Sequence, residues 1–208
     1  MTAALVLCVP ALLCGAPSLE QKRQALSGDY PPETYILGVG ESRSTGSDIR
    51  DFRVAEIMAR RDIAQQVRIA ISSIELDFAC GRNATEGGVD KVDCRDDFIS
   101  IIQASTSEFL SGSRIIEKGT DGDHVYVIVA MTRMELAAKA SEARADAIKD
   151  ARASMEMAHK GKADAPEEAR EAILRAKAYD SQARAMGEIR KDAQDLFMEL
   201  EAELEKLK

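Results

Sequence analysis

The stretch that decides the fold class is residues 124–131, which read HVYVIVAM. Apolar residues alternate along this stretch, as expected for a strand with one face on a core. Val125, Val127, Val129 and Met131 face one way, and His124, Tyr126, Ile128 and Ala130 face the other. Residues 114–118 predict a second strand, and residues 119–123 between the two are rich in types that tolerate a positive φ. The region therefore predicts a β-hairpin.

Upstream, residues 35–40 read YILGVG and predict a first strand. Ser47 is a candidate N-cap for a helix over residues 48–66. Apolar residues recur along this helix at spacings of three or four, which gives one buried stripe. The stripe consists of Phe52, Ala55, Ala59, Ile63 and Val67.

Between this helix and the hairpin the pattern changes twice. Apolar residues alternate over 67–71 and again over 74–78, which predicts a further strand with a bulge or bend. Residues 98–109 predict a second helix, ended by Ser111-Gly112-Ser113. The order is β-α-β-α-β-β, an α+β domain over residues 33–132. The polar segment 19–32, which ends in a proline pair, predicts a linker into it.

From residue 132 onward the composition predicts helices. Thr132 and Glu135 form a capping box that opens an Ala-rich helix, which Gly161 ends. Asp164 and Glu167 form a second capping box, with Pro166 tolerated in the first turn. Residues 133–208 therefore predict a helical hairpin tail.

The second tail helix has a strict seam with alternating spacings of four and three residues. The seam positions are Ala165, Ala169, Ala172, Ala176, Tyr179, Ala183, Met186, Arg190, Ala193, Phe197, Leu200, Leu204 and Leu207. A sustained period of 3.5 residues indicates coiled-coil packing against other helices. One interpretation is an antiparallel return against Ala140, Ala143 and Ala147 that folds onto its own domain. The other is an uncovered apolar end that binds a partner or a second copy. On that interpretation the partner-binding residues are Tyr179, Met186, Phe197, Leu200, Leu204 and Leu207.

Composition excludes some partners. The 208 residues include 28 Lys and Arg against 36 Asp and Glu, for a formal net charge of -8. Nucleic acid needs a basic face that neutralises phosphates, and no Lys/Arg cluster in the sequence exceeds its acidic neighbours. The same balance argues against adsorption to an anionic membrane.

The first residues predict export. Residues 3–14 are almost wholly apolar but shorter than the roughly 20 residues that a membrane-spanning helix needs. Together with the small residues Ala16-Pro17-Ser18 they match a signal peptide over residues 1–18. No Lys or Arg precedes the apolar stretch, so the true start codon is open. Cys14 stands where a lipoprotein cysteine would, but Leu12 and Leu13 replace the small residues of a lipobox; Cys14 is either lipidated or removed.

Cys80 and Cys94 remain in the exported chain and flank the polar segment 81–93. In an oxidising periplasm they predict a disulfide bond, which would stabilise by roughly 3 kcal/mol for a loop of about 15 residues. Free thiols are the main alternative. A metal site would need further ligands, and only His124 and His159 are available elsewhere.

Catalytic motifs are weak. Gly38-x-Gly40 lacks the third glycine of a dinucleotide fingerprint, so close backbone packing is the better interpretation. Neither His124 nor His159 lies near a marked Ser or Cys. Acidic pairs such as Asp96-Asp97 suit a helix start. We predict no enzyme activity, no cofactor, no metal and no catalytic residue.

Three features carry a family resemblance: residues 35–42, which read YILGVGES, the Ala-spaced helix through Ala55, Ala59 and Ala64, and the predicted strand 67–73. Together they resemble the LPP-twenty family of bacterial envelope lipoproteins, and they are similar to the flagellar outer-membrane lipoprotein P and to the N-terminal domain of flagellar assembly protein T. The resemblance covers roughly residues 30–132. It implies a small α+β domain in the periplasm or at the outer membrane, and ring or disc assembly in some members. It supplies no catalytic residues.

These features predict a cell-envelope protein that binds envelope proteins, or a second copy of itself, through its helical tail. The alternative is a module that binds peptidoglycan or another envelope polymer, for which the sequence has no aromatic platform.

Overall fold

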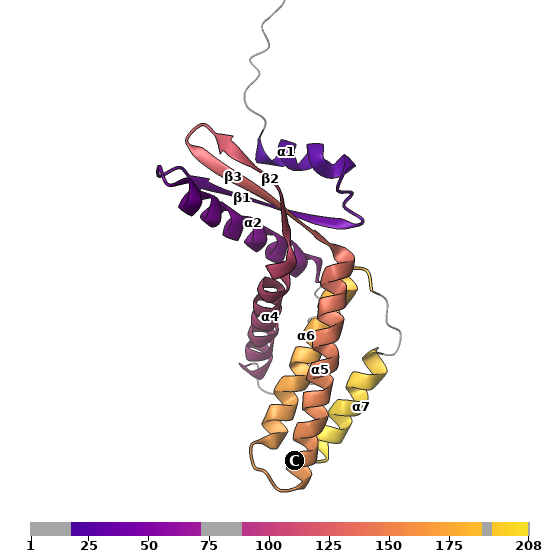
Figure 1. The fold of residues 1–208 in the computed structure, drawn as a ribbon. Helices are drawn as coiled ribbons and strands as arrows, with labels where there is room; N and C mark the ends of the chain where they lie inside the picture. Colours follow the sequence, from indigo (N-terminus) through magenta and orange to yellow (C-terminus); the bar gives the residue numbers. More distant parts are fainter. Residues whose placement is uncertain (1–17, 72–88, 189–192, 208) are drawn as a thin grey trace, which may run out of the picture.

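The computed structural model describes residues 18–71, 89–188 and 193–207. A small sheet and its helices form a body, and a bundle of helices extends from that body as a tail (Figure 1). The described elements up to residue 132 are α1 (Leu19–Ala25), a 3₁₀ turn (Leu26–Gly28), β1 (Tyr35–Arg43), α2 (Asp48–Ala70), α4 (Val89–Phe109), a second 3₁₀ turn (Leu110–Gly112), β2 (Arg114–Asp121) and β3 (His124–Thr132). Of these, α4 extends from the body alongside α6 of the tail (Figure 1). The described elements of the tail are α5 (Arg133–His159), α6 (Ala165–Ala185) and α7 (Ala193–Glu205).

The α+β class is confirmed. The strands form an antiparallel sheet in the order β1-β3-β2, with Tyr35 opposite Thr132 and Arg43 opposite His124. The hairpin is also confirmed, although β2 runs on to Asp121 and leaves only Gly122 and Asp123 as the turn. Gly122 has a φ of 61°, which explains why the turn needs a glycine.

One predicted strand is wrong in its first half. Residues 67–70 are the last turn of α2, with Val67 fully buried on the same stripe as Ile63. The alternation of Val67 and Ile69 fits a strand, but it fits equally a helix that has its buried face at 67 and an exposed residue at 69. Residues 74–78 lie outside the described residues. The order β-α-β-α-β-β is therefore not established.

Helix α2 covers one face of the sheet at very short range. A Cβ placed on Gly38 would overlap the carbonyl oxygen of Ala59, and one on Gly40 would overlap that of Ala55. These contacts confirm that the two glycines serve close backbone packing. The face of β3 that carries Val125, Val127, Val129 and Met131 is buried against the same helix, as are the alanines of its stripe. The small residues on both elements thus set the distance between helix and sheet.

The edge of the sheet at β1 is closed by side chains of α2. Asp62 accepts a hydrogen bond from the backbone N–H of Val39 at 3.0 Å, and Gln66 donates one to the carbonyl of Leu37 at 2.9 Å. Both groups would otherwise be open for pairing with another strand. The position of α2 is therefore fixed by polar contacts as well as by close packing.

The segment 19–32, expected to be a linker, contains α1, which lies on the side of the sheet opposite α2 (Figure 1). Ser18 and Gln21 form a capping box that starts this helix. Lys22 places its Nζ 3.7 Å from the centre of the Tyr126 ring and 3.5 Å from a carboxylate oxygen of Asp121. Ile128, on the same face of β3 as Tyr126, is fully buried.

The tail differs from the predicted two-helix hairpin. Helix α5 starts with the predicted capping box of Thr132 and Glu135 and ends as expected, with Gly161 at a φ of 85°. Asp164 is the N-cap residue of α6, but its side chain forms no capping bond, so the second capping box is wrong. The expected long second helix is also wrong, because α6 ends at Ala185 and a separate helix, α7, follows.

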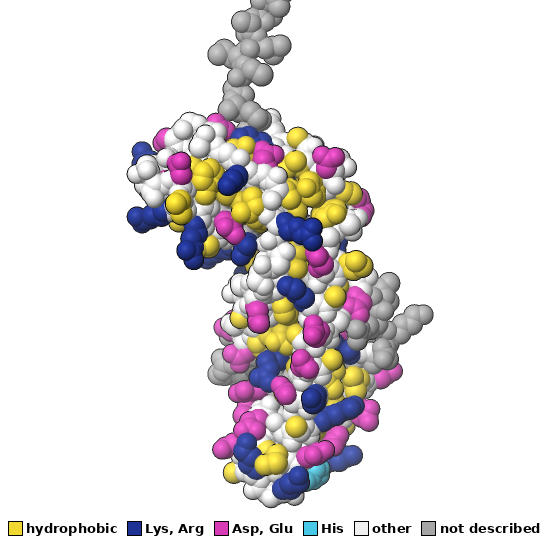
Figure 2. Space-filling view, viewed as in Figure 1, with side chains coloured by type: hydrophobic (Ala, Val, Ile, Leu, Met, Phe, Trp, Pro, Cys, Tyr) yellow, Lys and Arg dark blue, Asp and Glu magenta, His cyan; other side chains and the backbone are white. Residues whose placement is uncertain are grey.

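A glycine ends α6. Gly187 has a φ of 98°, and the N–H groups of Gly187 and Glu188 bond to the carbonyls of Arg184 and Ala183. This is a Schellman motif, in which a glycine ends a helix in the left-handed conformation. The chain then returns, and α7 packs beside α5 and α6 (Figure 1). Figure 2 shows the resulting surface, with acidic and basic side chains interspersed along the tail.

Candidate partner-binding surface

The seam predicted to bind a partner is covered by the chain itself. Phe197 is 0% exposed, Leu200 2% and Leu204 5%, all of them against alanines of α5 and α6. Leu207 packs against the edge of the same cluster, and Met186 is buried in the core that the tail shares with the body. The interpretation in which the seam folds onto its own domain therefore describes these residues best.

Tyr179 lies where the tail meets α4. Its ring packs against Phe109 with centroids 6.1 Å apart, and burial raises the pKa of its hydroxyl above the usual 10.0. The residue is partly exposed, so of the six predicted residues it is one that a partner could reach. It nonetheless serves as a packing contact between α4 and α6.

Charged residues that the sequence analysis did not single out lie inside the tail. Arg144 of α5 and Asp180 of α6 form an ion pair of 2.9 Å, and both side chains are almost fully buried. The guanidinium carbon of Arg144 lies 5.3 Å from the centre of the Phe197 ring, a cation–π contact. Arg184 adds a second, longer approach to Asp180 at 3.8 Å. A buried ion pair therefore lies under α7.

A second charged contact holds α7 against α6. Lys177 of α6 pairs with Glu201 of α7 at 2.5 Å, and its side chain is only 2% exposed. The aliphatic stem of a lysine can pack against apolar neighbours while its ammonium reaches a carboxylate. The position of α7 thus depends on one large ring, two leucines and the pairing of Lys177.

Helix α4 is tied to α6 by a buried amide. Gln182 donates to the carbonyl of Ile102 at 3.0 Å and to the hydroxyl of Thr106 at 2.7 Å, and it also bonds Ser105. A buried glutamine with all its groups paired fixes both the register and the rotation of the two helices. No pattern in the sequence pointed to this residue, because polar residues flank the seam throughout α6.

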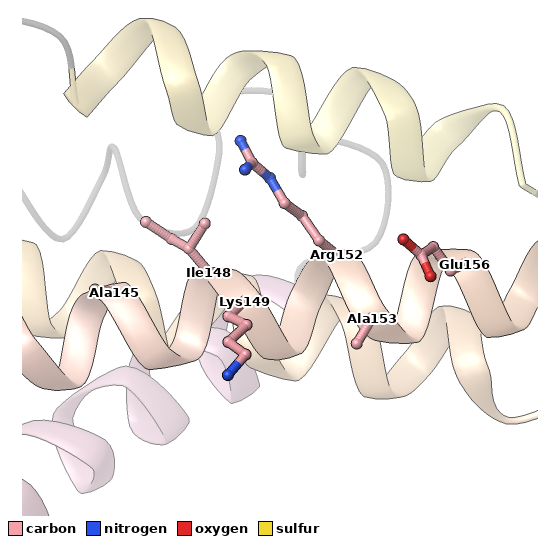
Figure 3. Close-up of a pocket in the computed structure, with 6 residues that line it drawn as sticks. All are labelled: Ala145, Ile148, Lys149, Arg152, Ala153 and Glu156. Carbon is pink, nitrogen blue, oxygen red and sulfur yellow. The ribbon is translucent and has the colours of Figure 1, made fainter.

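Two hollows on the described surface are open ones. One of about 320 Å³ is lined by residues of α5 alone: Ala145, Ile148, Lys149, Arg152, Ala153 and Glu156. Ile148 and Arg152 point toward α7 in this view, whereas Lys149 points away (Figure 3). A second, lined by residues of α4, the second 3₁₀ turn and α5, includes Glu108, Lys139 and Asp146. Both are shallow surface features between neighbouring side chains.

The remaining candidate residues are dispersed. His124 lies at the start of β3, with its Nδ1 2.9 Å from a carboxylate oxygen of Asp123, and His159 ends α5. Within residues 18–71, 89–188 and 193–207, no three or more His, Cys, Asp and Glu are placed to hold a metal ion. In the same ranges no helix is long and apolar enough to cross a bilayer.

Two predicted cysteine sites involve residues that the structure leaves undescribed. Cys94 lies on α4 and is partly buried, but Cys80 lies outside the described residues, so the disulfide stays a prediction. Cys14 and the predicted signal peptide up to residue 17 lie outside them as well.

No family model, curated protein or solved structure matches this chain. The resemblance to the LPP-twenty family therefore remains a prediction from the sequence. Of the three features that carry it, β1 and the Ala-spaced helix α2 are present, and the third begins with a turn of helix where a strand was expected.

Proposed function

We propose that this protein is a non-catalytic structural component of the bacterial cell envelope, which acts through contacts with other protein chains. The proposal takes its location from the sequence, where an apolar stretch and small residues match an export signal. It takes its mode of action from the shape and the surface of the tail.

The observation that carries the proposal is that body and tail share one core. Leu136 and Ala140 of α5 and Ala183 and Met186 of α6 are buried together with the sheet residues of the body. A shared core of this kind resists hinge motion, because interiors are close-packed. The tail is therefore a stiff extension of the body (Figure 1), and such an extension suits a part that spaces or joins other chains.

The tail presents charged residues outward and keeps its apolar seam inside. A partner could bind by displacing α7, which would expose Phe197, Leu200 and Leu204 together. It could instead bind the outer surface and leave α7 in place. We favour the outer surface, since displacement would return the buried side chains of Phe197, Leu200 and Leu204 to water and would break the pairing of Lys177 with Glu201.

Location and partners are tested together in the bacterium that encodes the chain. The full chain, tagged at its carboxyl end, is expected in the envelope fraction, and Leu7→Arg with Leu12→Arg is expected to hold it in the cytoplasm. Cys14→Ser separates the two interpretations of Cys14, because loss of membrane association indicates lipid and unchanged association indicates none.

The same strain tests the binding of proteins. A photo-crosslinking amino acid at the exposed positions Met157 and Met198, which are 43% and 51% exposed, is expected to yield an adduct with a second protein chain. The buried position Leu200 is the control and should give no adduct between chains. A chain that stays cytoplasmic, or one that gives no adduct from any exposed tail position, would overturn the proposal.

A further inference from the structure

Helix α2 carries an exposed face that nothing in the described structure covers. Its exposed basic residues are Arg50, Arg53, Arg61 and Arg68. The apolar residues among them are Ile49 at 87% exposure, Ile57 at 58%, Met58 at 43% and Ile69 at 70%. Figure 2 shows basic side chains gathered along the edge of the body where α2 lies.

Of the acids of α2, Asp48 is exposed at the first residue of the helix, and the other three are buried or engaged by neighbouring groups. Asp51 is buried and binds the backbone N–H and the hydroxyl of Thr45. Glu56 pairs with Arg60 at 2.6 Å, and Asp62 is engaged at the edge of β1. The face is therefore basic and apolar, although the whole chain has a net charge of -8.

Helix α7 presents the opposite surface. Its buried side holds Phe197, Leu200 and Leu204, and its exposed side carries Asp195, Glu199 and Glu203. Met198, half exposed, adds an apolar patch to that acidic side. No Lys or Arg lies within the helix from Ala193 to Glu205. An acidic face with one apolar patch is thus the complement of the face on α2.

The two faces belong to different parts of the chain. Helix α2 packs against the sheet of the body, whereas α7 packs beside α5 and α6 far along the tail (Figure 1). Each is anchored by its own buried side, so they cannot meet within one molecule without unfolding. Contact between them requires two copies.

We propose that the occupant of the α2 face is the α7 face of a second copy of this chain, so that copies join head to tail. The inference deepens the proposed function and rests on it. Since the two contacting faces are different surfaces, each copy would keep one of each free, and the contact would generate a ring or an open chain. The apolar residues Ile57 and Met58 would meet Met198, with arginines and carboxylates around them.

The contact should be weak and sensitive to salt. Exposed ion pairs contribute little each, and salt screens them. Sedimentation velocity of the full chain is expected to show association that rises with protein concentration and weakens about tenfold when NaCl is raised from roughly 0.05 to 0.5 M.

Neutralised variants give the decisive test. Arg53→Gln with Arg61→Gln removes charge from the α2 face, and Glu199→Gln with Glu203→Gln removes it from the α7 face. Each variant alone is expected to sediment as a single chain. A 1:1 mixture is expected to form a complex of two chains and no larger species, because each partner supplies the one intact face that the other lacks.

A matched control is Lys149→Gln with Lys160→Gln, which changes the net charge by the same amount at two exposed residues, one on α5 and one at its C-cap, and should associate as the native chain does. All variants keep residues 1–17, so association through that segment would persist in every one of them. Circular dichroism verifies that each variant is folded.

Three results would overturn the inference. The first is a native chain that stays a single chain at every concentration. The second is association that both variants retain, and the third is a 1:1 mixture of variants that forms no complex.

Vesicles of phosphatidylglycerol and phosphatidylethanolamine test a lipid surface as the other occupant. Binding by a single-chain native protein that is lost in Arg53→Gln with Arg61→Gln would assign the α2 face to lipid. An adduct with another envelope protein in cells, without self-association in solution, would leave the proposed function standing and refute only the inference.

Discussion

The contact of α2 with β1 in the body and the contact of α7 with its neighbours in the tail depend on different kinds of interaction. In the body, Gly38 and Gly40 lie against the backbone of α2 with no room for a side chain. In the tail, α7 is held by a few large apolar residues over a buried ion pair and by the pairing of Lys177 with Glu201. The first contact depends on shape and the second on charge as well, so the two should fail under different substitutions.

The largest expected effect is in the tail. Asp180→Ala would leave the guanidinium of Arg144 buried without its carboxylate, which typically costs about 3–5 kcal/mol. Chemical denaturation measures this loss. The control is Asp150→Ala, which removes an exposed partner of Arg175 at 3.7 Å and should change stability by under about 1 kcal/mol. Equal effects from both would contradict the role given to the buried pair.

A more local failure is expected at Phe197. Phe197→Ala removes the ring that packs over Arg144, at a cost of about 3 kcal/mol. Because α7 is joined to the rest mainly through this face, hydrogen exchange should rise across α7 and little in α2. Met198→Ala, at a half-exposed neighbour, should leave exchange unchanged. Uniform loss of protection in both helices would show that α7 does not open separately.

In the body, Gly40→Ala is expected to lower the free energy of unfolding by about 2–3 kcal/mol, because the new methyl group overlaps the carbonyl of Ala55 and forces the helix off the sheet. Thermal unfolding measures the change. Gly28→Ala is the control, since a Cβ there meets no heavy atom within 4 Å. A Gly40→Ala protein as stable as the native one would contradict the claim that the contact of α2 with β1 depends on the absence of a side chain at residue 40.

The smallest expected effect is on the pH dependence of stability, through the carboxyl group of Asp51. Hydrogen bonds from the backbone and then the hydroxyl of Thr45 hold the pKa of Asp51 below its ordinary value of 3.8. A carboxyl whose pKa is lowered on folding contributes stability above pH 3.8, and this contribution is lost as the pH falls through the folded value. Asp51→Asn should therefore be less stable than the native chain at pH 7 and should lose less of its stability on acidification below about pH 4. Parallel pH profiles for the two proteins would contradict this assignment.

The sequence correctly predicted those helices and strands whose residue pattern fits only one kind of secondary structure. The alternation in β3, the capping box at Thr132 and the stripe of α2 each fit a single kind of element. The strand predicted over residues 67–71 failed because Val67 and Ile69 suit a strand and a helix end equally. The long second tail helix failed because the seam spacing continues unbroken past residue 187, although Gly187 ends α6 there in a left-handed conformation.

The candidate surface was harder to predict for a physical reason. The seam residues were correctly identified as apolar and helical, but whether they face a partner or the same chain depends on how the chain returns after Gly187. The charged faces of α2 and α7 are visible only once buried acids such as Asp51 are separated from exposed ones. The net charge of a stretch of sequence counts buried and exposed acids alike, so it does not reveal these charged faces.

The most direct measurement combines isotope labelling with crosslinking. A photo-crosslinker replaces Met198 in unlabelled full chains, which are mixed with ¹⁵N-labelled native chains, irradiated, digested and analysed by mass spectrometry. The account predicts adducts that join α7 of an unlabelled chain to a ¹⁵N-labelled peptide from residues 48–70. Adducts confined to peptides of other regions, or no adduct between labelled and unlabelled chains, would contradict it.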